Sequence, residues 1–492
     1  MSESNEMKQN FDETIWNVGM PTLPPDASTV DYQFVKYENI TNVTDTTNYK
    51  VFSTDMNAEF LPQSAMLEVE YKLTTAAGAD LTDAEHTVLA SNGFKIFQDA
   101  KLTLNGQEKA NIQDPGMACH MGLLTESSRD YIQTVGKNAG YYIDEANDLN
   151  GNGVPDDTEV NYKPPHVDGA LPIADVLDNG KYRPLSYVDK IQTRKDNVTF
   201  NNATAGSVAT AIRPNPNYDS SFADKIKKTG NQRLFLPLAH IFPILNIDRI
   251  MSGIKFEVEL NKVSNVASCV FGATTDVKLV ISRVALWIAK YTPSFAAKSF
   301  YEKQKAAHPV VKHSFEGMGL QVLPYPDISA GSKTWQISHK FNMPTTVIIG
   351  FQDRRRQNNV KLNPLTFDLL EGKLGRIALR SNGKQIPSYA YNPLTDKHRI
   401  LHDMQKITGK LNDTLDSAPI NMENYSELYP LFMFDCEKSS SSAYEARTSS
   451  TLELEWTVNS DVVNNYNVYA LIYSQGEVHV DHSTAETLFR LY

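Results

Sequence analysis

The segment DLNGNGVPDDTE, from Asp148 to Glu159, has the composition and spacing of a calcium-binding loop. It carries Asp at the first position, Asn at the third and fifth, Gly at the sixth, Asp at the ninth and Glu at the twelfth, which is the ligand pattern of an EF-hand loop. Calcium is a hard cation that prefers oxygen ligands. The predicted ligands are the side chains of Asp148, Asn150, Asn152, Asp156 and Glu159 and the carbonyl oxygen of Val154.

The residues that flank this loop do not fit an EF-hand. Pro164 and Pro165 follow it closely, and proline cannot continue a helix, so no exiting helix is possible there. The segment instead resembles the helix-free calcium turns of thrombospondin type 3 repeats. A calcium ion would order a loop that is too polar to bury a core. An ordinary turn without an ion remains the alternative.

The segment GEVHVDHS near the end of the chain is a second candidate metal site. As a strand it places Glu477, His479 and Asp481 on one face, with His482 adjacent, and carboxylate and imidazole groups can hold a metal. The alternative is an ordinary strand whose polar residues contact another subunit. A cupin metal site would need a second set of His and Glu residues, which the sequence lacks.

Three consecutive arginines, Arg354 to Arg356, form a third candidate site. They predict either a contact with nucleic acid or with an acidic neighbouring subunit, or a solvated turn after the strand TTVIIGF. We favour the turn.

No pattern in the sequence predicts catalysis. The chain has no G-x-S-x-G, G-x-x-x-x-G-K-[ST], H-E-x-x-H or C-x-x-C motif. Cys119, Cys269 and Cys436 lie far apart, so we expect core residues and neither a disulfide framework nor a zinc cluster. The sequence therefore predicts a protein that is not an enzyme.

Composition limits the class of protein further. The chain has 492 residues and a formal net charge of −11, so it is long enough for two or three domains, and its acidity argues against broad nucleic-acid binding. The polar N-terminus has no apolar core of a secretory signal, and no stretch of about 18 uninterrupted apolar residues exists. We expect a protein that is neither secreted nor membrane-spanning.

Strands dominate the chain, and their order occurs twice. In the first copy MLEVEYKL, AKLTLNGQEK and IKFEVELNK alternate between apolar and polar residues, and DVKLVISRVALWIAKY is apolar on both faces. The second copy has KTWQISHKF, GRIALRSNGKQIP, TLELEWTVNS and NVYALIYSQGEVHV. Both copies contain an Asn-Gly hairpin signal. We align Leu452 with Ile254 and Leu454 with Phe256, and so predict one β-unit used twice.

The elements between the strands define the predicted domains. Helices are expected from Pro115 and from Pro293-Ser294, the second bridging the two units. We predict an N-terminal arm over 1–50, a first β-sandwich over 51–292, and a linker helix with a second sandwich over 293–492. The first copy also contains a polar insertion over about 136–232, which includes the calcium-like segment and is expected to form a long loop at one end of the sandwich.

Three segments carry a resemblance to a known family: MLEVEYKLTT, AKLTLNGQEK and RLFLPLAHIFPILNIDRIMSGIKFEVELNK. With the tandem units they resemble double jelly-roll major capsid proteins, in particular those of Polinton-like viruses and virophages, over most of the chain from Ala58 onward. The resemblance implies an all-β fold of two tandem jelly-roll sandwiches with short helices and long apical loops. The calcium-like loop is not part of the family pattern.

The resemblance also implies a structural role. Such a chain would form a homotrimer with pseudo-hexagonal shape, contact neighbouring trimers, penton and minor capsid proteins, and tile an icosahedral shell around double-stranded DNA. The genome or an internal membrane would face only its inner side. The expected location is the virion, after assembly inside the host cell. The alternative is a carbohydrate-binding or carbohydrate-active protein of two β-sandwiches with a structural calcium ion.

Overall fold

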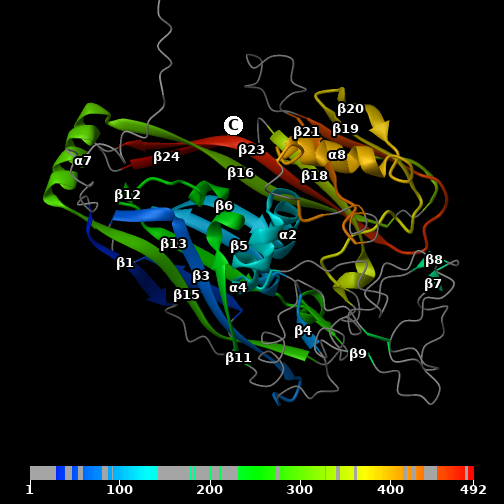
Figure 1. The fold of residues 1–492 in the computed structure, drawn as a ribbon, viewed down its shortest axis with the longest axis horizontal. Coiled ribbons are helices and arrows are strands. Elements are labelled where there is room, and N and C mark those ends of the chain that lie inside the picture. The colour runs from blue at the N-terminus through cyan, green and yellow to red at the C-terminus, as the bar shows by residue number, and fades with distance from the viewer. Residues whose placement is uncertain are drawn as a thin grey trace, which may run out of the picture.

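The computed structural model of the chain is drawn as a ribbon in Figure 1. It describes residues 29–38, 47–53, 59–79, 87–90, 92–141, 177–178, 181–182, 199–200, 210–211, 231–272, 277–326, 329–339, 344–358, 363–413, 418–420, 422, 425, 428–436, 451–481 and 486–491. Two antiparallel β-barrels lie side by side, joined by one helix (Figure 1).

The first barrel consists of two facing sheets with strand orders β1-β15-β3-β11 and β2-β13-β5-β6, and β12 also pairs with β3. Their bounds are β1 Thr29–Glu38, β2 Asn48–Phe52, β3 Glu59–Thr75, β5 Phe97–Leu104, β6 Gln107–Gln113, β11 Asn231–Pro237, β12 Met251–Ser252, β13 Phe256–Lys262 and β15 Val277–Pro293. The rings of Phe60 and Phe256 meet between the sheets, with centroids 5.9 Å apart. The alternation in β3 and β13 therefore points one face of each strand into a common core, as predicted.

The second barrel repeats this arrangement with strand orders β16-β23-β18-β21 and β17-β22-β19-β20, and β24 also pairs with β23. Their bounds are β16 Val310–Tyr325, β17 Gly331–Ile337, β18 Pro344–Asp353, β19 Leu374–Ser381, β20 Lys384–Tyr391, β21 Phe432–Asp435, β22 Leu452–Val458, β23 Tyr466–Asp481 and β24 Glu486–Leu491. The Trp456 ring packs against Phe351 and Tyr325 across the two sheets. The strand orders of the two barrels match position by position, so the predicted repeat is confirmed. One correspondence was wrong, because KTWQISHKF contains β17, the counterpart of β2, whereas the counterpart of MLEVEYKL in β3 is β18.

The residue-by-residue alignment of the two copies was wrong by two positions. In the first barrel the Asn105 side chain accepts a hydrogen bond from the Lys255 amide at 2.7 Å. In the second, Asn382 accepts one from the Thr451 amide at 2.9 Å. Lys255 therefore corresponds to Thr451, and Leu452 corresponds to Phe256, not to Ile254. A shift of two residues keeps every side chain on its own face, so alternation alone cannot detect it.

The N-terminal segment and two further elements also differ from expectation. Within the predicted arm, β1 pairs with β15 along its length, and β2 pairs with β13. Strand β16 and a helix after β20, α8 (Lys397–Ile407), had no counterpart in the sequence prediction. β16 was missed because polar residues occupy much of it.

The helices lie at the ends and the junction of the barrels. The predicted helix from Pro115 is present as α2 (Pro115–Glu126) and α3 (Arg129–Gln133), with α4 (Val135–Asn138) after it, and Ser127 and Ser128 separate α2 from α3. The predicted bridging helix is α7 (Phe295–Ala307), and the Ser294 side chain caps its N-terminus. In the described part of the chain, none of the helices has the length and apolar character that a membrane crossing requires.

Short elements complete the described chain. They are β4 Thr87–Leu89, β14 Val270–Gly272, β7 Leu177–Asp178, β8 Lys181–Tyr182, β9 Thr199–Phe200 and β10 Thr210–Ala211, with 3-10 turns η1 Gly93–Ile96, η4 Leu238–His240, η5 Pro243–Leu245, η6 Val266–Ser268 and η7 Arg354–Gln357. The labels of β7 and β8 lie at the opposite end of the molecule from α7 (Figure 1).

Candidate functional site

The predicted calcium ligands, Asp148, Asn150, Asn152, Val154, Asp156 and Glu159, lie outside the described residues. The calcium site therefore remains a prediction.

Residues 476–481 of the GEVHVDHS segment form the end of β23, with β16 on one side and β24 on the other. His479 is buried, and its Nε2 lies 2.9 Å from the Glu477 carboxylate. The side chains of Asp481 and His482 are not described. Among the side chains that are described, no group of three or more His, Cys, Asp or Glu residues could hold a metal ion.

The three cysteines lie in the core, as predicted. Burial raises the pKa of Cys119, Cys269 and Cys436 to about 12 in each case. Each side chain therefore stays a neutral thiol near neutral pH and acts as a small apolar group.

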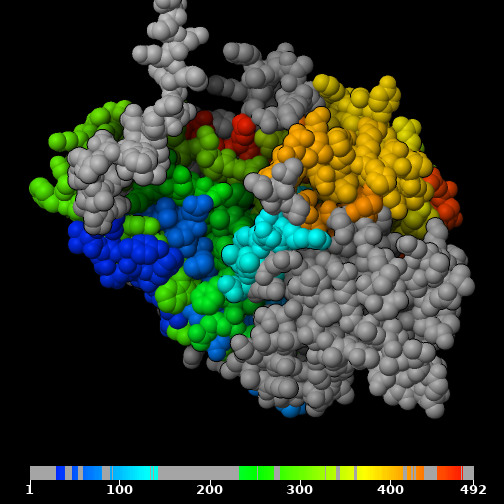
Figure 2. Space-filling view, in the orientation of Figure 1, coloured from blue at the N-terminus to red at the C-terminus, as the bar shows by residue number. Residues whose placement is uncertain are grey.

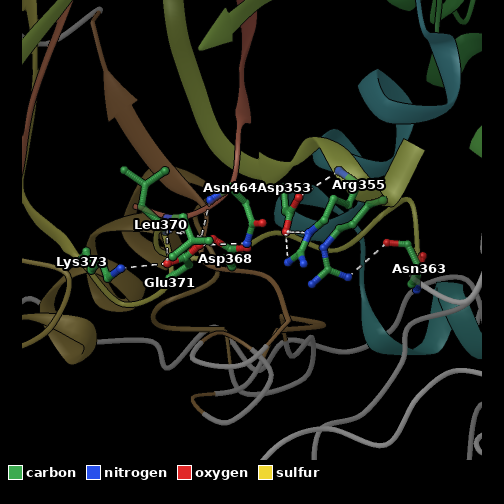
Figure 3. A network of polar contacts seen from close by, with 10 residues as sticks. Asp353, Arg355, Asn363, Asp368, Leu370, Glu371, Lys373 and Asn464 are labelled. Atoms are coloured by element: carbon green, nitrogen blue, oxygen red, sulfur yellow. Dashed lines mark hydrogen bonds and ion pairs between the residues drawn. The ribbon is translucent and has the colours of Figure 1, made fainter. Parts of the chain in front are cut away.

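The arginine triplet forms η7, a turn directly after β18, as favoured from the sequence. Asp353 caps this turn by accepting from the Arg355 amide at 2.9 Å, and its carboxylate also accepts from the Arg355 guanidinium at 2.8 and 2.5 Å (Figure 3). The hydrogen bond with Asp353 raises the pKa of Arg355. Arg354 and Arg355 are exposed, while Arg356 is half-buried. The triplet is therefore partly a structural element and not simply a solvated turn.

Next to this turn lies a network of polar contacts that the sequence did not predict (Figure 3). Glu371 accepts from the amides of Val463 and Asn464 and from Lys373. Burial alone would raise the pKa of Glu371, but these hydrogen bonds outweigh it and hold that pKa below its ordinary value. Leu370 and Glu371 both have positive φ, an unfavourable conformation that the contacts of Glu371 offset.

Asp368 is the most perturbed acid in this network. Burial raises its pKa to about 6, although the Arg356 charge and a hydrogen bond from Tyr466 act in the opposite direction. Its carboxylate also accepts from the Leu370 amide at 2.8 Å. No nucleophile lies paired with a base in this network, so its chemistry is that of a structural ionic cluster.

The two barrels contact each other through α2, which lies between them in Figure 1. The His120 ring is fully buried among three aromatic rings, stacked on Phe367 with centroids 6.4 Å apart and edge-on to Tyr429 and Tyr141. Phe367 and Tyr429 belong to the second barrel. Burial lowers the pKa of His120 to about 3, so the ring is neutral near pH 7.

Polar contacts support the same junction. Lys410 of the second barrel donates to the Ser127 carbonyl at the end of α2, at 2.7 Å. Asn265, the cap of η6 in the first barrel, donates to the Gln357 carbonyl in η7 at 3.0 Å. A Cβ on Gly122 would lie 2.6 Å from the Tyr473 hydroxyl, so glycine allows α2 to approach β23 closely. The two barrels thus form one packed body.

Comparisons with known proteins agree with this fold. No protein-family model and no curated protein sequence matches the chain. A chain in the cryo-EM structure of the Sputnik virophage is similar with a TM-score of 0.58 and 9% identity, over 100% of this chain and 92% of that chain. Mavirus major capsid protein is similar with a TM-score of 0.51 and 8% identity, over 100% of this chain and 95% of that chain. The predicted all-β fold of two tandem jelly rolls is confirmed.

Proposed function

We propose that the protein is a major capsid protein whose role is structural and not catalytic. The observation that carries the proposal is a double jelly roll in one chain, similar over its full length to a Sputnik virophage chain and to the mavirus major capsid protein. Matching strand orders in the two barrels provide two near-equivalent building blocks per chain. Such blocks suit a capsomer with pseudo-six-fold packing.

In this proposal three chains form a homotrimer with six barrels, as the resemblance to double jelly-roll capsid proteins implies. Trimers contact each other and penton and minor capsid proteins, and together tile an icosahedral shell around double-stranded DNA. The genome or an internal membrane lies on the inner face only. The protein is located in the virion and assembles inside the host cell. The rigid junction at α2 supports this role, because a tile must hold its two barrels in a fixed orientation.

Light scattering of the purified chain tests the assembly. We expect a mass of three times the 55.0 kDa of one chain. Negative-stain images should show pseudo-hexagonal particles. A stable monomer at micromolar concentration would contradict the proposal, since obligate interfaces bury roughly 2,000 Å² or more and do not dissociate readily.

We also propose that the segment from Asp148 to Glu159 binds calcium, on the strength of its ligand spacing. The ion would order an apical loop and take no part in chemistry.

A further inference from the structure

Exposed apolar side chains gather at one end of the molecule. In the described part of the chain, twelve large hydrophobic residues are exposed, and seven of them lie on β1, on α7 and on the segments beside α7. The seven are Val30, Tyr32, Phe34, Ile250, Phe295, Phe300 and Val310. We call this region the α7 end. Figure 2 shows α7 and β1 on the surface at the same end of the molecule. Patches of this kind mark binding surfaces.

The seven residues come from segments that are adjacent in space. Thr29 at the start of β1 pairs with Pro293, directly before α7, and the Tyr32 ring contacts Tyr291 with centroids 4.9 Å apart. On the other side of α7, Ile250, Tyr301 and Val310 line one open pocket. The segments that carry the seven residues thus adjoin α7, β1 at its start and Ile250 and Val310 along its second half.

Helix α7 presents most of its surface to solvent. None of its residues is buried, and Phe295 and Phe300 are 90% and 63% exposed. Only Ala297, Tyr301 and Lys305 are partly covered. Exposed phenylalanines do not stabilise the helix in the isolated chain, so their place here indicates a partner that covers them.

Helix α7 and the segment after it are basic in an acidic protein, whereas β1 carries Asp31 and Glu38 against Lys36. Residues 294–313 contain Lys298, Lys303, Lys305 and Lys312 against the single acid Glu302, a formal charge of +3, while the whole chain carries −11. Glu59 on β3 lies near Lys298 and Lys305 and offsets one of these charges. The cations thus stand among the exposed apolar residues and not apart from them.

We propose that the α7 end binds a lipid surface that contains anionic lipids. Apolar side chains would enter the boundary between headgroups and acyl chains, and the lysines would contact lipid phosphates, as in interfacial helices. Duplex DNA would attract the lysines but would leave Phe295 and Phe300 in water, so the aromatic residues favour lipid. The inference rests on the proposed function only for the location of that lipid, on the inner face of the shell.

Vesicle flotation of the full chain tests this proposal. We expect the protein to float with vesicles of phosphatidylcholine mixed with phosphatidylserine, with affinity on the order of tenfold lower for phosphatidylcholine alone and at high salt. The variant Phe295→Ser/Phe300→Ser should lose on the order of tenfold in affinity, and so should Lys298→Gln/Lys303→Gln. The control Tyr389→Ser/Leu394→Ser removes two exposed apolar side chains of the second barrel and should float like the wild type.

Three outcomes would overturn the proposal. The first is no flotation with anionic vesicles, and the second is equal flotation of the phenylalanine variant and the wild type. The third is a lower mass of that variant in light scattering, which would make the α7 end a contact between copies.

All the substituted residues are exposed, and circular dichroism checks that the variants fold. The oligomeric mass of the same samples separates the two proposals, because a monomer that floats contradicts only the capsid role, and a trimer that does not float contradicts only the lipid site.

Discussion

Each barrel carries a helix after its Asn-Gly hairpin, but α2 and α8 have different surroundings. α2 is buried along most of its length, whereas α8 buries only Ile400 and Met404 and lies on the outer surface (Figure 1). Both helices have His as their sixth residue, His120 in α2 and His402 in α8. His120 is enclosed by aromatic rings from both barrels, and the His402 side chain is 55% exposed.

A helix follows the hairpin in both copies of the repeat, but the residues of each helix depend on whether the neighbouring barrel covers it. α2 buries ten of its twelve residues and contains Gly116 and Gly122, where a Cβ would approach Lys95 and Tyr473 within 2.6 Å. α8 has one apolar stripe and an outer face of charged residues. The helix of the first copy, α2, thus forms the contact between the two barrels.

The largest expected effect comes from a charge at the sixth position of these helices. His120→Asp places an uncompensated carboxylate among aromatic rings and should lower the free energy of unfolding by more than about 3 kcal/mol. His402→Asp, at the matching exposed position, should change it by less than about 0.5 kcal/mol. Urea denaturation measures both. Equal effects of the two variants would refute the difference between the helices.

A second difference between the barrels is the ionic cluster around Asp368 in the second one. The folded-state pKa of about 6 lies above the ordinary value, so the folded state binds the proton more tightly than the unfolded chain does. Ionisation of Asp368 therefore lowers the stability of the folded state. This loss of stability is absent below about pH 4, grows as the pH rises through the folded pKa, and is complete above that pKa.

Asp368→Asn removes this loss of stability and keeps an oxygen that can accept from the Leu370 amide. We expect the variant to be more stable than the wild type by about 1–3 kcal/mol near neutral pH and equally stable near pH 4. Urea denaturation at the two pH values measures the change. Asp248→Asn, at an exposed carboxylate, is the control and should have little effect at either pH. A variant that is less stable than the wild type near neutral pH would show that the Arg356 charge outweighs burial.

The repeat itself was accessible from the sequence because equivalent strands of the two copies, such as β13 and β22, alternate strictly between apolar and polar residues. β13 and β22 bury every second residue, and both hairpins have positive φ at Asn and Gly as predicted. The exact alignment was not accessible, since alternation repeats every two residues. It required the hydrogen bonds of Asn105 and Asn382 across the hairpins.

The polar network and the junction could not be read from local patterns. Arg356, Asp368 and Asn464 come from three separate segments that only the folded barrel brings together. His120 likewise gave no signal, because its aromatic neighbours Phe367 and Tyr429 lie in the other barrel. Strands with regular alternation were thus predictable from the sequence, whereas β16, α8 and the contacts between distant segments were not.

Substitutions in the two Asn-Gly hairpins test whether the barrels are equivalent, and their expected effects on stability are smaller. Asn105→Ala and Asn382→Ala each force alanine into positive φ and remove a hydrogen bond to the adjacent strand, so each should cost about 1–2 kcal/mol of stability. Asn→Gly at either site should cost less, because glycine tolerates positive φ. Urea denaturation measures the free energy of unfolding of the four variants. A loss of stability in only one of the two hairpins would show that they are not equivalent.

The smallest expected effect on the barrels concerns the insertion of the first copy, which the second copy lacks. The variant Asp148→Ala/Asp156→Ala removes two of the predicted calcium ligands. Calorimetry should detect calcium binding to the wild type at up to about millimolar concentration and none to the variant. The melting temperature of the barrels should be nearly unchanged, because the sequence of the insertion is polar and predicts a loop outside the two cores. The control Asp156→Asn keeps an oxygen ligand and should weaken calcium binding without abolishing it.

No calcium binding to the wild type would mean that the segment is an ordinary turn. A large loss of barrel stability in the variant would show that the insertion packs against the first barrel.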